Sequence, residues 1–233
     1  MRGQMNLPTI DRVNKIFIIT LVTVFLLNAF AGFADFSLYP FLSLSLGSLA
    51  TGKVWTLLTY VVLPGGLIEL IFNALIIWFI GSELSAGWGE KRYLQFIVVT
   101  TLGAAIISLG INATMSSMGS LAGASAFCSA LCVAYGVINP ERTMYFFFFP
   151  LQAKWFVAIL VGMNLYNGIF SSTGGILAWS QLGAMACGYT WMVWISSPRK
   201  KIAPKQKKNN LKNSHLSIVK EAPEEPEDKP TYH

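Results

Sequence analysis

The sequence predicts an all-α membrane protein: a bundle of six transmembrane helices followed by a polar tail. Its composition is the first reason, because 54% of the residues are hydrophobic and only 12% are charged, whereas a typical soluble domain has about 25% charged residues. The second is that the apolar residues gather in six runs without a formal charge. With their polar flanks, these runs approach the roughly 20 residues that a membrane-spanning helix needs. They cover residues 16–34, 70–82, 93–112, 120–139, 155–171 and 174–197.

The first apolar run has a basic flank and contains Ala29-Phe30-Ala31, so a cleaved signal peptide is an alternative to a transmembrane helix. The run is long for a signal peptide, and we expect it to be retained as the first span. Residues 1–13 then form a cytoplasmic N-terminal segment, and residues 14–197 form the membrane domain. Membrane-spanning strands would require a closed barrel with period-two alternation, which the sequence does not show.

The basic residues predict the orientation of the bundle, since Lys and Arg accumulate on the cytoplasmic side of short loops. With a cytoplasmic N-terminus, six spans place every one of the 17 Lys and Arg residues except Lys53 on the cytoplasmic side. Both termini are therefore expected in the cytoplasm. Many of these cations crowd behind the last apolar run, where they are typical of a membrane flank and not of a nucleic-acid groove. If the cell is bacterial, the plasma (inner) membrane is the expected location.

The longest predicted connection is an outer loop over about residues 35–65, which is too apolar to be a plain linker. We expect a re-entrant or membrane-surface hairpin there, with Trp55 and Tyr60 at the interface. Two uncharged outer connections are expected near 115–119 and 172–174. Residues 198–233 change from basic to acidic and contain prolines, which predicts a disordered cytoplasmic tail. A protein-docking role for this tail is the alternative.

The cysteines and histidines predict neither a metal site nor a cofactor. Cys128, Cys132 and Cys187 lie within apolar runs and lack the spacing to His or acidic residues that a metal site requires. We therefore expect them to be reduced packing residues. His215 and His233, the only histidines, lie in the polar tail.

Polar residues inside the predicted spans are the candidates for function, because polar groups are costly in hydrocarbon. Asn73, Ser125 and Gln181 each lie a few residues from the outer end of a predicted helix, which would bring them into one layer. Glu69 precedes Asn73 by one helical turn. The alternative is that these side chains only join helices through hydrogen bonds, each contributing about 1 kcal/mol. Small residues around 119–126 and 183–188 predict that the fourth and sixth helices touch.

Taken together, these motifs resemble the rhomboid family of intramembrane serine proteases. The segment Gly123-Ala124-Ser125-Ala126 is similar to the family's Gly-x-Ser-Gly nucleophile motif, and Gln181 to Gly188 is similar to its His-x-x-Gly-x-x-x-Gly helix. The stretches 55–60 and 69–84 resemble its late outer loop and second helix. The resemblance covers about residues 14–197 and implies the rhomboid fold.

The resemblance also implies roles for four residues. Ser125 occupies the nucleophile position and Asn73 the position of the oxyanion asparagine. Gln181 replaces the histidine base, and Glu69 replaces the second-helix histidine. An amide has no usable basicity near neutral pH, so Gln181 cannot accept the serine proton.

Further departures from the family pattern also argue against serine hydrolysis. Ala126 and Ala184 replace glycines, and Thr56 stands where the family usually has arginine. The two added methyl groups would crowd the place where the fourth and sixth helices meet.

The function expected from this pattern is that of a rhomboid-like pseudoprotease, which binds transmembrane client segments in the lipid bilayer without cleaving them. One alternative is a weak or unusual intramembrane serine protease that uses Ser125 with Glu69 or water as the base. A small-solute transporter is a third interpretation. The polar residues disfavour it because they stay in the outer half, whereas a transport path must run through both leaflets. The sequence predicts no oligomeric state.

Overall fold

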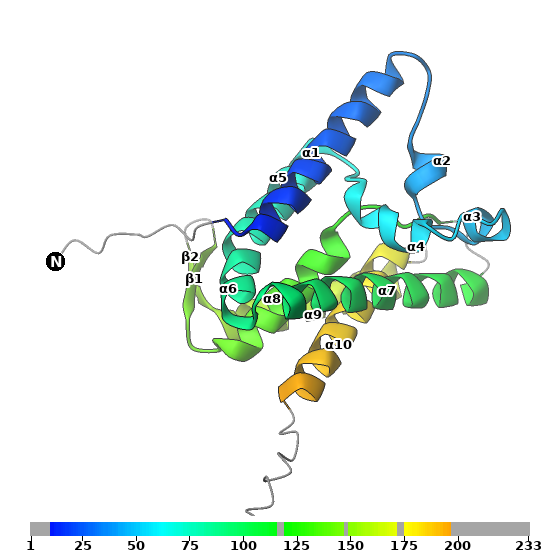
Figure 1. Ribbon diagram of the computed structural model, residues 1–233. Coiled ribbons are helices and arrows are strands. Elements are labelled where there is room, and N and C mark those ends of the chain that lie inside the picture. The colour runs from blue at the N-terminus through cyan, green and yellow to red at the C-terminus, as the bar shows by residue number, and fades with distance from the viewer. Residues whose placement is uncertain (1–9, 116–118, 147–148, 172–174, 197–233) are drawn as a thin grey trace, which may run out of the picture. The chain divides into compact units, whose positions relative to one another are not determined.

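A computed structural model describes residues 10–115, 119–146, 149–171 and 175–196 of the protein (Figure 1). All of these residues lie within one compact unit, Met1–Ser197. The predicted tail over 198–233 lies outside the described residues, as do residues 116–118 and 172–174 of the two predicted outer connections.

Six helical segments correspond to the six predicted spans. They are α1 (Arg12–Gly32), α5 (Leu67–Ile76) continued by the π-helical turn η2 (Ile77–Gly81) and α6 (Ser82–Trp88), α7 (Glu90–Met115), α8 (Ser125–Ile138), α9 (Ala153–Phe170) and α10 (Ile176–Ser196). Four of them, α1, α5–α6, α7 and α9, are long and apolar enough to cross a membrane, and α8 is a shorter apolar helix. The prediction of an all-α membrane protein is confirmed. Which side of the membrane each helix end faces stays a prediction.

The second span is longer than predicted. The charge-free run 70–82 excluded two acidic residues that lie inside the observed helix, which covers Leu67–Trp88. Both charges have partners: Glu69 accepts a hydrogen bond from the backbone N–H of Gly65, and Glu83 pairs with Arg142. Partnered charges are tolerated within a helix of this kind, so a charge-free run underestimates its length.

The fourth helix begins later than predicted. We expected it over 120–139, but the first residue of α8 is Ser125. The preceding segment is not helical because it pairs with the outer loop: Leu44 and Leu121 exchange backbone N–H···O hydrogen bonds of 2.9 and 2.7 Å. The small residues from Gly119 to Ala124 therefore form the approach to the helix and not its first turns.

The outer loop is folded, with short helices α2 (Tyr39–Leu42), α3 (Leu46–Ala50) and α4 (Thr56–Thr59) and the 3₁₀ turn η1 (Tyr60–Val62). The Tyr60 side chain is completely buried and donates a hydrogen bond to the carbonyl of Thr101 on α7. Phe41 and Trp55 are exposed, and the Trp55 indole N–H donates to the Phe41 carbonyl. The interfacial position predicted for Trp55 fits its exposure, but the predicted place for Tyr60 is wrong because that ring fills the core.

A short β-hairpin joins α8 to α9, and we did not expect it from the sequence. Strands β1 (Thr143–Phe146) and β2 (Phe149–Gln152) pair antiparallel, with Thr143 opposite Gln152 and Phe146 opposite Phe149. Strands of four residues carry too little periodic signal to be predicted from the sequence.

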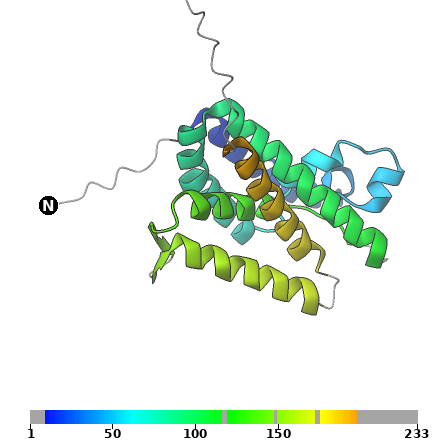
Figure 2. The same cartoon turned by 90° about the horizontal axis from the view of Figure 1, so that it is seen from below.

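Helix α8 forms the centre of the helical bundle. Every residue from Ala126 to Gly136 is buried. The helix contacts α5, α7, α9 and α10, and Figure 2 shows it between the longer helices. An apolar helix that is buried on all sides is typical of a bundle core.

Helices α7 and α10 pack closely through glycines. At Gly103 on α7 an added Cβ would overlap the side chain of Cys187 on α10, and at Gly188 it would press on the Phe96 ring. Small residues allow such close approach between membrane helices, where packing contributes much of the stability.

Gly103→Ala is expected to lower the free energy of unfolding by about 1–3 kcal/mol, because the added methyl overpacks the α7–α10 contact. Gly110→Ala is the matched control on the same helix, since nothing lies within 4 Å of a Cβ at that position. Thermal unfolding in detergent measures both. Equal unfolding midpoints for the two variants would contradict the close packing described here.

Candidate active site

Ser125 is the first residue of α8, with Ala124 as the N-cap. We predicted a position several residues into the helix, which is wrong because the extended approach segment delays the helix start. The Ser125 hydroxyl is buried and has no hydrogen-bond partner within the part of the chain that the structure describes. A helix N-terminus favours negative charge, so the backbone around Ser125 suits a nucleophile whose reaction develops an anion.

Gln181 lies on α10 and faces α8, but its hydrogen bond reaches a different serine. Its Oε1 accepts from the hydroxyl of Ser129 at 3.4 Å. Ser129 follows Ser125 by four residues and so lies one turn further along the same face of α8. The predicted contact between the fourth and sixth helices is confirmed by this bond.

Glu69 and Asn73 form a pair on α5. Glu69 Oε1 accepts from Asn73 Nδ2 at 3.4 Å, while Oε2 accepts from the backbone N–H of Gly65 at 3.0 Å. The Asn73 side chain is buried, and its backbone carbonyl accepts a weak hydrogen bond from the thiol of Cys128 on α8 at 3.8 Å. The amide expected to stabilise an oxyanion is therefore engaged with a carboxylate.

The Glu69 carboxylate lies directly against the segment that leads to Ser125. Gly123 has a φ of +101°, and a Cβ built there would overlap Glu69 Oε1. The Gly123 N–H donates to the Tyr60 carbonyl at 2.9 Å, which fixes this turn on the outer loop. Glycine is needed here for both its backbone conformation and its lack of a side chain.

The outer loop covers this carboxylate from the other side. The hydroxyl of Tyr39 donates to the Pro64 carbonyl next to Gly65. Burial, and then the charge of Glu69, raise the pKa of Tyr39, so this phenol stays neutral beside the acid. Burial also raises the pKa of Tyr60. The site therefore combines one carboxylate with neutral polar groups.

Among the residues that the structure describes, this site holds no imidazole. Proton removal from Ser125 needs a base, and an amide is not one. A tetrahedral intermediate needs donors for its oxyanion, yet the Glu69 side chain lies against Gly123 and accepts the hydrogen bond of the Asn73 amide. An ionised Glu69 would repel an oxyanion formed at this site, because like charges interact strongly in a low-dielectric environment.

The two alanines that replace family glycines are both buried. Ala126 is 1% exposed and Ala184 is 0% exposed, so their methyl groups occupy space inside the helix contacts. The threonine in place of the family arginine is also buried, and the hydroxyl of Thr56 donates to the Lys53 carbonyl at 2.7 Å.

Three residues of the site were missed from the sequence: Ser129, Gly65 and Tyr39. The four-residue spacing from Ser125 was a usable signal for Ser129, because it puts both hydroxyls on one helix face. Gly65 and Tyr39 belong to the outer loop, and their contacts with Glu69 depend on how that loop folds.

A family model described as Rhomboid domain matches residues 51–198, more than half of the 233 residues. The matched region includes the end of the outer loop and α5 to α10, and thus all four candidate residues. No match is found among curated proteins.

Proposed function

Because this chain belongs to the rhomboid family, we propose that it is a pseudoprotease, which binds transmembrane client segments and affects their folding, trafficking or turnover without cleaving them. The observation that carries this proposal is the pairing of Gln181 with Ser129. A neutral amide, hydrogen-bonded away from Ser125, stands where the family has its base, while the framework around the serine is kept.

The outer half of α5 supports client binding. Leu67, Ile68 and Ile71 are exposed on this helix, next to the Glu69–Asn73 pair. An apolar face beside partly buried polar groups allows a client helix to pack in the bilayer and to place a polar residue near Glu69. The expected client is therefore a transmembrane segment with a polar or basic residue in its outer half.

Photo-cross-linking in proteoliposomes tests client binding at this face. We expect a photoreactive phenylalanine at Ile68 to capture a transmembrane client peptide. The same probe at Ile106, a similarly exposed isoleucine on α7, is the matched control and should capture several-fold less. Replacing Ser125 by Ala should leave the capture unchanged. Equal capture at both positions would contradict lateral binding beside α5.

A weak serine protease is the second candidate, and the position of Glu69 against Gly123 favours it. In that case the carboxylate, directly or through a water, takes the Ser125 proton. This hypothesis predicts slow cleavage of a transmembrane substrate that is lost in both Ser125→Ala and Glu69→Gln. Cleavage that survives Glu69→Gln excludes Glu69 as the base.

A further inference from the structure

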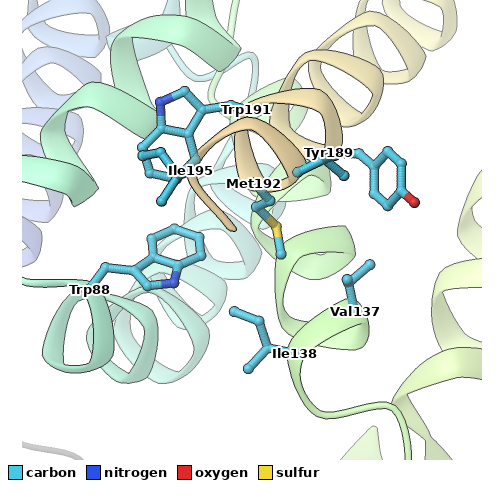
Figure 3. A pocket seen from close by; sticks show the side chains of 8 residues that line it. Trp88, Val137, Ile138, Tyr189, Trp191, Met192 and Ile195 are labelled. Carbon is cyan, nitrogen blue, oxygen red and sulfur yellow. The ribbon is translucent and has the colours of Figure 1, made fainter. Parts of the chain in front are cut away.

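A second site lies at the opposite end of the central helix. A cavity of about 520 Å³ opens between the last turns of α8 and α10, with Trp88 at the end of α6 on its other side (Figure 3). Its lining consists of hydrophobic and aromatic side chains. It includes Trp88, Val137, Ile138, Trp191, Met192 and Ile195. Ser125 and Ile138 are the two ends of α8, about 20 Å apart at the usual helical rise, so this cavity is separate from the candidate active site.

On one side of the cavity, aromatic rings pack against one another. The rings of Trp88 and Trp191 lie 5.3 Å apart, and each also packs on Phe96, at 5.2 and 5.4 Å. Packing on several rings fixes the tryptophans in place, so we expect the cavity to be formed before a ligand arrives. Its volume is in the range of sites for small ligands, and its apolar lining suits a hydrocarbon chain better than a polar solute.

Two cations follow the cavity residue Trp88 closely in the sequence. Lys91 and Arg92 follow Trp88 within four residues, and both are exposed. In the described ranges neither has an ion-pair partner, whereas Arg142 pairs with Glu83 and Lys154 with Glu141. Glu90 is the acidic residue next to them in the sequence, so the first turn of α7 has a net positive charge.

We propose that this cavity binds one anionic phospholipid, with an acyl chain between α8 and α10 and a headgroup phosphate at Lys91 and Arg92. Apolar walls supply the affinity for the chain, and the cations select the charge of the headgroup. Anionic lipids concentrate at the cytoplasmic surface, which is where the predicted orientation places these two residues. The site leaves Ser125 and its neighbours free, so it is independent of the proposed function.

Native mass spectrometry of the full-length protein in detergent tests this site, using phosphatidylglycerol and phosphatidylcholine with identical acyl chains. We expect one phosphatidylglycerol to bind tighter than phosphatidylcholine, by about fivefold for each cation that contacts the headgroup. Val137→Trp, which fills the cavity from an exposed position, should abolish this retained lipid. Ile159→Trp, an equally exposed position on α9, should leave it.

A second set of variants tests the preference for an anionic headgroup without changing the packing of the core. Lys91→Gln with Arg92→Gln should bring the affinities for the two lipids together. Arg12→Gln with Lys15→Gln, which removes two exposed cations from α1, should keep the preference. The proposal is overturned if Val137→Trp retains the lipid as well as wild type does, or if both charge pairs alter the preference equally.

Discussion

Gln181→His alone is expected to leave the cleavage of a transmembrane substrate near background, whereas Gln181→His combined with Glu69→His is expected to raise it by at least about 10²-fold. The first substitution returns a base to α10. It does not remove the carboxylate that holds the Asn73 amide and lies against Gly123. Loss of one oxyanion donor typically costs about 10²–10³ in rate, and an ionised Glu69 beside the oxyanion would add to that cost.

Product formation in proteoliposomes, followed by gel, measures this pair of variants. Gln181→Asn with Glu69→His is the matched control, because it corrects the carboxylate but supplies no base at position 181. It should stay at background. Equal cleavage by the single and double histidine variants would show that Glu69 does not oppose the chemistry, and would overturn this part of the account.

Gly123→Ala is expected to destabilise the protein by more than about 2 kcal/mol. The backbone at this position is in the left-handed region, where a side chain costs about 1–3 kcal/mol, and the added methyl overlaps the Glu69 carboxylate. In a Glu69→Ala background only the backbone cost remains. The two substitutions should therefore couple by about 0.5–3 kcal/mol.

Unfolding midpoints of the four proteins in this cycle, measured in detergent by tryptophan fluorescence, give the coupling. Gly66→Ala is the control. This glycine is the N-cap of α5, its backbone is extended, and nothing lies within 4 Å of a Cβ built there. A loss at Gly123 that is the same with and without Glu69 would mean that the carboxylate does not press on this turn.

The helical frame could be predicted from the sequence because a bilayer requires each span to satisfy its own backbone hydrogen bonds over a fixed length. The ends of the helices could not. Glu83 lies inside its helix because it pairs with Arg142, which is 59 residues away in the chain. Ser125 begins its helix because Leu121 pairs with Leu44. Both facts depend on partners that a local pattern does not contain.

Four residues of the candidate site could be singled out from the sequence, but their hydrogen-bond partners could not. Asn73 and Gln181 stood out as polar residues in apolar runs, and both are now seen to be hydrogen-bonded. That is what the simpler explanation, polar contacts between and within helices, also predicts. Ser125 is the candidate that the simpler explanation does not cover, because its buried hydroxyl has no hydrogen-bond partner among the described residues.

The measurement that tests the central claim most directly is cleavage of a transmembrane substrate by the wild-type protein in proteoliposomes, beside its Ser125→Ala variant and an active rhomboid protease. The account predicts that the active protease releases product and that the wild-type chain and Ser125→Ala give the same background. Product released by the wild-type chain and abolished by Ser125→Ala would contradict the account and establish a protease.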